Sequence, residues 1–101
     1  MKTNGMRPVH PGEVLHEEFL LELGITPTTL ARALKVSVPT VNDIIRERRD
    51  VSADMAIRLA RYFGTSADFW MNLQSACALA TAYAANGEQI VHEVEPLAGR
   101  G

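Results

Sequence analysis

Hydrophobic residues recur at helical spacing along most of the chain, and turn residues divide this pattern into five segments. The first segment follows His10-Pro11-Gly12, places Leu15, Phe19 and Leu23 at four-residue intervals, and stops at Gly24. Apolar residues at every fourth position line one face of a helix. The pattern therefore predicts a first helix that begins after His10 and ends before Gly24.

The next two segments are short, and each is introduced by a capping residue. Thr26 precedes Pro27, which the first turn of a helix accepts because a backbone N–H there has no partner. This second helix runs to about Lys35, and Ser37 caps a third. The expected inward residues of the pair are Leu30, Ala31, Leu34, Val41, Ile44 and Ile45. Two short helices joined by a tight turn predict a helix-turn-helix over about 27–46.

Capping residues also introduce the last two helices. Ser52 caps a fourth helix, with the apolar stripe Ala56, Leu59, Ala60 and Phe63, and Gly64 ends it. Thr65 and Asp68 have capping-box spacing and introduce a fifth helix to about Ala85. Beyond Asn86-Gly87, a turn signal, residues 90–94 are compatible with a short strand or an extended arm.

These segments predict an all-α, five-helix bundle with a tail that is either a short strand or an arm. We expect a flexible N-terminal segment at 1–9, a helix-turn-helix domain at 10–86 and a C-terminal arm at 87–101. A chain of 101 residues, 47% of them hydrophobic, suits one compact domain. There is no apolar run of membrane-spanning length and no secretory signal pattern, so we expect a cytoplasmic protein.

The distribution of charge changes the picture more than the net charge of −2 does. Residues 32–61 carry seven Lys or Arg against four Asp or Glu, whereas both flanking parts are acidic. A positive middle between acidic ends is typical of a chain in which one face meets a polyanion. A scatter of solvated charges is the alternative interpretation.

The third predicted helix of the chain is the second helix of the helix-turn-helix motif. In such motifs this helix enters the major groove, so its outward side chains are the ones expected to read DNA. Asn42 can bond adenine through both of its polar atoms, and Arg46 can reach guanine or phosphate. The expected contacts at or near base edges are Val38, Thr40, Asn42, Asp43 and Arg46. The expected phosphate contacts are Ser37, Arg48 and Arg49. An ordinary helical hairpin with a polar face is the alternative.

A dimer or partner interface is expected outside the helix-turn-helix. The fifth helix carries a face of small residues, on which another helix can approach closely. Phe69 and Trp70 are adjacent in this helix and therefore point in different directions, so they cannot both contact the same surface. We expect one of these two rings to reach a partner. The candidate interface residues are Trp70, Leu73, Ala80, Ile90 and Val94.

Nothing in the sequence indicates an enzyme, a metal site or a cofactor. His16-Glu17 begins an H-E-x-x-H pattern, but Leu20 stands where the second histidine is needed. Cys77 is the only cysteine, which excludes an internal disulfide and a thiolate zinc cage. His10 is better explained as fixing the start of the first helix.

The chain resembles the HigA-type, or VapI-like, antitoxins of the Xre/Cro helix-turn-helix family. The resemblance covers about residues 8–80 and is carried by HPGE at 10–13, by Arg48 and Arg49, and by ADMAIRLARYFGTSADFW at 53–70. It implies a lambda-repressor-like fold and a homodimer that represses at a palindromic operator. It also implies that the protein neutralises a HigB-type ribonuclease toxin and regulates its own operon.

Two residues depart from the pattern of that family. Lys35 in the turn and Glu47 after the third helix stand where the family often has glycine. If both need a positive φ, each costs about 1 kcal/mol, and Glu47 adds a negative charge beside the phosphate path. Two alternatives therefore stay open. One is a toxin-neutralising protein with weak DNA binding, and the other is an orphan Xre-type regulator without a toxin.

Overall fold

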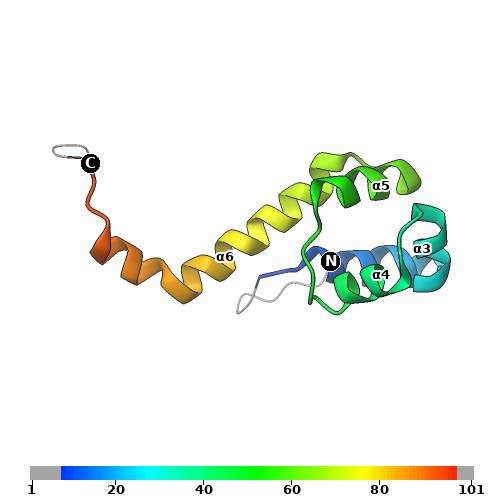
Figure 1. Cartoon of the computed structure of the whole chain (residues 1–101), viewed down its shortest axis with the longest axis horizontal. Coiled ribbons are helices and arrows are strands. Elements are labelled where there is room, and N and C mark those ends of the chain that lie inside the picture. Colours follow the sequence, from blue (N-terminus) through cyan, green and yellow to red (C-terminus); the bar gives the residue numbers. More distant parts are fainter. Residues whose placement is uncertain (1–7, 98–101) are drawn as a thin grey trace.

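Five successive helices make up the computed structural model, which describes residues 8–97 and contains no strand among them (Figure 1). The predicted all-α fold is confirmed. Residues 1–7 of the expected N-terminal segment, and 98–101 of the expected arm, lie outside the described residues. The first helix is continuous through α1 (Pro11–Val14), η1 (Leu15–Leu20) and α2 (Leu21–Leu23). The others are α3 (Pro27–Leu34), α4 (Val38–Ile45), α5 (Ala53–Phe63) and α6 (Ala67–Glu93).

The helix starts follow from the predicted caps, with one correction. The hydroxyl oxygens of Thr26, Ser37 and Ser52 each accept a hydrogen bond from the backbone N–H three residues on. The cap of α6 is Ser66, not Thr65 as the capping-box spacing suggested. The Thr65 hydroxyl instead accepts a hydrogen bond of 2.8 Å from Nε1 of Trp70. A buried indole N–H needs a partner, so the cap falls to the next residue.

The first helix departs from the predicted spacing because its middle is π-helical. The segment Leu15–Leu20 is a π-helix, which holds more residues per turn than an α-helix. The buried residues are therefore Leu15 and Leu20, five apart, and Leu23 is 59% exposed. The prediction that Leu23 faces the core is wrong for this reason.

Trp70 is the centre of the core and is fully buried. Its ring centroid lies 5.1 Å from that of Phe19 and 6.4 Å from that of Phe63. The prediction that Trp70 reaches a partner is therefore wrong, because its neighbours within the same chain already surround it. Phe69 is the more exposed of the two rings, at 38%.

The last helix is longer than predicted and leaves the body of the molecule (Figure 1). It continues through Asn86-Gly87 to Glu93, so the predicted turn and the candidate strand over 90–94 are both wrong. One glycine inside a helix costs only about 1 kcal/mol, and a strand would need a neighbouring edge, which residues 8–97 do not offer. No helix within the described residues is long and apolar enough to cross a membrane.

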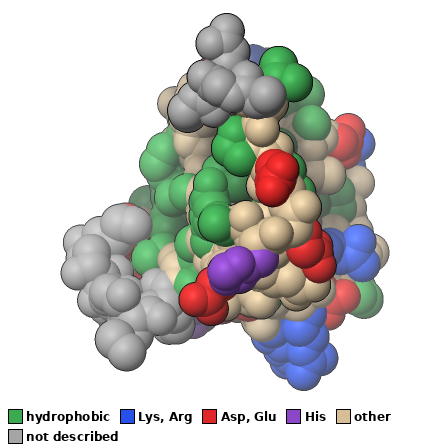
Figure 2. Space-filling model, turned by 90° about the vertical axis from the view of Figure 1, so that its left-hand side faces the viewer, with side chains coloured by type: hydrophobic (Ala, Val, Ile, Leu, Met, Phe, Trp, Pro, Cys, Tyr) green, Lys and Arg blue, Asp and Glu red, His purple; other side chains and the backbone are tan. Residues whose placement is uncertain are grey.

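Residues 78–97, which we call the outer arm, are exposed except for Gly87. The arm nevertheless carries large apolar side chains. These are Leu79, Tyr83, Ile90, Val91, Val94 and Leu97. Figure 2 views the molecule from this end and shows hydrophobic side chains gathered on the face nearest the viewer. The other residues within 8–97 leave these side chains uncovered.

Candidate nucleic-acid interface

The turn between α3 and α4 has the tight geometry of a helix-turn-helix. Lys35 adopts φ 62°, in the left-handed region, and the N–H of Val36 donates 3.0 Å to the Ala31 carbonyl. Ala31 is 1% exposed, and Leu30 and Val41 are also buried in the core between the helices. The positive φ expected at Lys35 is thus present.

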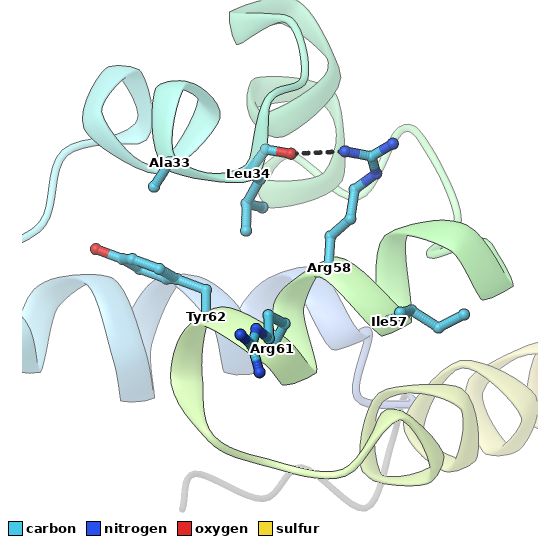
Figure 3. A pocket seen from close by; sticks show the side chains of 6 residues that line it. All are labelled: Ala33, Leu34, Ile57, Arg58, Arg61 and Tyr62. Atoms are coloured by element: carbon cyan, nitrogen blue, oxygen red, sulfur yellow. Dashed lines mark hydrogen bonds between the residues drawn. The ribbon is translucent and has the colours of Figure 1, made fainter.

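The C-terminal end of α3 is held by a side chain from α5. Arg58 donates from Nη1 to the carbonyl of Leu34 at 2.8 Å (Figure 3). Its Nε donates to the Asp54 carboxylate at 2.7 Å. The four-residue spacing of Asp54 and Arg58 is typical of an ion pair along one helix, whereas the bond to Leu34 joins two helices. Carbonyls at a helix end have no partner within the helix, so Arg58 supplies one and fixes α3 against α5.

The outward face of α4 presents most of the residues expected to read bases. Thr40, Asn42 and Asp43 are half-buried, and Arg46 is exposed, whereas Val41 and Ile44 point into the core. Val38 is partly buried against the core, which leaves only part of its side chain at the surface. One helix therefore displays a polar face beside a buried apolar one.

Ser37 lies at the N-terminal end of this face, and its hydroxyl caps α4. It accepts a hydrogen bond of 3.2 Å from the N–H of Thr40 and lies 2.7 Å from the Thr40 hydroxyl. Both oxygens remain near the surface at the N-terminal end of α4. This end of a helix carries partial positive charge and attracts phosphate.

The loop after α4 brings Arg48 and Arg49 next to the helix end. Glu47 adopts φ 63°, and the N–H of Arg48 donates 2.8 Å to the Asp43 carbonyl, which closes the chain back onto α4. Arg49 Nη2 lies 3.7 Å from Asp43 Oδ2, with both side chains substantially exposed. Asp43 thus faces an arginine of the same surface, a contact that its predicted role at a base edge did not include.

A buried glutamine fixes this loop from α6. Gln74 is 8% exposed, and its Oε1 accepts a hydrogen bond of 2.7 Å from the N–H of Val51. The sequence analysis missed this residue. Its signal is its position four residues after Trp70 and three before Cys77, on the buried side of α6. Since an unpaired buried N–H costs about 1–3 kcal/mol, Gln74 ties the loop to the core.

The N-terminal end of the first helix also packs on this region. His10 Nδ1 accepts a hydrogen bond of 2.9 Å from the N–H of Gly12, as expected for a residue that fixes the helix start. Its Nε2 lies 4.0 Å from Asp50 Oδ1 in the same loop. Gly12 lies directly against the backbone of Ile44 in α4. The HPGE segment therefore packs against α4 and the loop that follows it.

The expected interface residues occupy different surroundings. Leu73 packs partly against the core, whereas Ala80, Ile90 and Val94 are exposed on the outer arm. Ile90 also lines an apolar hollow with Leu79 and Tyr83. Three of the five expected residues thus lie on one exposed segment.

Replacing Glu47 with glycine is expected to stabilise the protein by about 1 kcal/mol, because glycine adopts a positive φ without the side-chain penalty. The measurement is the urea midpoint of the purified variant. The matched control is Arg46→Gly, one residue earlier at φ −85°, where glycine only adds disorder to the unfolded chain. Equal effects at both positions would contradict strain at Glu47.

Comparison with known proteins places this arrangement among characterised folds. The sequence matches the helix-turn-helix family over residues 17–70. The structure of the Pseudomonas aeruginosa antitoxin HigA with the higBA promoter is 74% identical, covers 90% of this chain and 99% of that one, and superposes with a TM-score of 0.88. The antitoxin GraA in complex with its operator is 52% identical, covers 98% and 100%, and gives 0.88. Virulence-associated protein I of Dichelobacter nodosus is 49% identical over 72% of this chain and 68% of its own length.

Proposed function

Because the chain belongs to the helix-turn-helix family and, within it, to the HigA-type antitoxins, we propose that it is a DNA-binding antitoxin that represses its own operon. The polar face of α4, continued by Arg48 and Arg49, is the observation that carries the proposal. The similarity to two antitoxins whose structures contain promoter or operator DNA supports it. Acting on DNA, the protein works in the cytoplasm, and its role is binding rather than catalysis.

The α4 face reads the operator, and its surroundings hold the DNA backbone. Asn42 and Arg46 contact base edges, with Thr40, Val38 and Asp43 beside them. Phosphates are bound by Ser37, Arg48 and Arg49. The ion pair of Asp43 with Arg49 supports a role for Asp43 in aiming that guanidinium.

The operator is palindromic because the protein binds it as a homodimer. The exposed apolar row of the outer arm, including Ile90 and Val94, supplies a surface that a second copy can cover. In that dimer the two α4 helices lie about 34 Å apart, one turn of B-DNA. The second partner is a HigB-type ribonuclease toxin, which the protein neutralises by direct binding.

The test is a gel-shift titration of the purified protein against the region upstream of its gene, with a random duplex of equal length as control, at two salt concentrations. Tight, upstream-selective binding by a dimer is the expected result. Weak binding that is equal on both duplexes would overturn the repressor role. It would favour the toxin-neutralising alternative, for which the exposed carboxylate of Glu47 beside Arg48 is the supporting observation.

Replacing Asn42 with alanine is expected to relax the preference at one base pair by about 1–3 kcal/mol, since the bidentate contact of its amide is lost. The measurement is the affinity for operator duplexes with every base pair substituted in turn. A parallel titration with Thr28→Ala, an exposed residue of α3, controls for general effects. Equal loss on operator and random DNA would argue against base reading by Asn42.

A further inference from the structure

The surface where the first helix meets α3 is an apolar groove of about 340 Å³. Its lining consists of His16, Leu20, Leu21, Gly24, Ile25, Thr26 and Pro27. Leu21 is 63% exposed at its edge, and Leu23 is 59% exposed nearby. Full burial of a leucine side chain contributes about 1.5–3 kcal/mol, so a partner that covers these two gains appreciable free energy.

The first helix, which forms one side of this groove, carries several carboxylates. Residues 8–31 contain four glutamates and no lysine or arginine. Glu18 and Glu22, four residues apart on either side of Leu21, are both exposed. We call the groove with Leu21, Leu23, Glu18 and Glu22 the acidic groove. Its negative charge repels DNA phosphates, so it is not an extension of the DNA-binding face.

We propose that the acidic groove is the docking site for the basic, RNA-cleaving toxin, an inference that rests on the proposed antitoxin function. A protein that binds and cleaves RNA needs a cationic surface for the phosphates. Carboxylates beside an apolar groove match such a surface: the charges steer the encounter, and the groove accepts an apolar anchor. Other occupants fit less well. A second copy in a symmetric contact would bring like carboxylates together.

A groove on another side of the body lacks this complementarity. It lies between α3 and α5 and is lined by Leu34, Ile57, Tyr62 and the two arginines Arg58 and Arg61 (Figure 3). Its cationic edge would repel a basic partner. The two grooves therefore differ in charge, and the one at the end of the first helix suits a basic toxin better than the one between α3 and α5.

The experiment measures the affinity of the full-length protein for the HigB toxin encoded with the Pseudomonas aeruginosa antitoxin, which is 74% identical to this chain. The variants are Glu18→Lys with Glu22→Lys, and Leu21→Ser. The control is Glu88→Lys with Glu95→Lys, which makes the same charge change at exposed positions of the outer arm. Circular dichroism and urea midpoints establish that each variant is folded, and size-exclusion chromatography compares their oligomeric states.

We expect the double charge reversal to weaken toxin binding about 100-fold, the size expected for close charge pairs across an interface, and Leu21→Ser to weaken it about 10-fold. The control keeps wild-type affinity. Unchanged binding by the acidic-groove variants, or equal loss in the control, would overturn the docking site while leaving the antitoxin function intact. A wild-type protein that does not bind this toxin would instead overturn the proposed toxin partner.

Discussion

A chain carrying Gly12→Ala is expected to lose most of its stability, by at least about 3 kcal/mol, because a new methyl group has no space in a packed core. A Cβ at this position would lie 1.8 Å from the Ile44 carbonyl oxygen and 2.8 Å from its carbon. These are backbone atoms of α4, and they do not move aside as the end of a side chain does. The same carbonyl accepts a hydrogen bond from the N–H of Glu47, so displacing it also disturbs the loop after α4.

Urea unfolding of this variant measures the loss, and Gly87→Ala provides the matched control. An added Cβ at Gly87 meets only the side chain of Tyr83, which is 72% exposed and can rotate. Alanine also favours the helix over glycine by about 1 kcal/mol. We expect this control to retain or gain stability. A stable Gly12→Ala protein with normal DNA binding would show that the first helix and α4 do not need this close contact.

Replacing Arg48 and Arg49 together with alanine is expected to weaken binding to every DNA sequence. It should also reduce the slope of log affinity against log salt concentration by up to about two per protomer. Each phosphate neutralised by a cation releases a counterion, which contributes about 0.9 to the slope of log affinity against log salt. The fold should be unaffected, because both side chains are exposed. Titrations at several salt concentrations against operator and random duplexes give the slopes.

The matched control for this double variant is Arg32→Ala with Arg61→Ala, which removes the same charge from exposed positions of α3 and α5. The control should change the slope little. A slope that stays at its wild-type value when Arg48 and Arg49 are absent would exclude both from the phosphate contacts. A loss of affinity for the operator alone, with unchanged affinity for random DNA, would instead indicate that Arg48 and Arg49 contact base edges.

Most helix boundaries could be predicted from the sequence, because a capping residue or a terminating glycine depends on only one or two positions. Ser37, Ser52, Gly24 and Gly64 act where the sequence indicated. The family resemblance also suggested a positive φ at Lys35 and Glu47, and both residues adopt one. Neither position has glycine, so the folded chain accepts this strain in return for the two tight connections.

The remaining features depend on contacts between distant segments, which spacing does not encode. Gln74 bonds a residue 23 positions away, and Trp70 is buried because the first helix and α5 bring Phe19 and Phe63 against it. The outer arm was misread for the opposite reason: Asn86-Gly87 is a strong local turn signal that a long helix overrides. For the candidate DNA-binding site, the sequence indicated which residues lie on the outward face of α4. It did not indicate the side chains, such as Gln74 and Arg58, that fix the loop after α4 and the end of α3.

The π-helical turn at Leu15–Leu20 has a consequence for how the first helix can change in length. An insertion into a regular α-helix rotates every later side chain by about 100°, which would turn a buried face to solvent. A π-turn absorbs one additional residue locally, so the residues before and after it keep their orientation. A single-residue deletion within this turn can therefore convert it to plain α-helix while Val14 and Leu20 still face the core. Among the helices of the body, this is the one that can lose a residue with the least disturbance of its buried side.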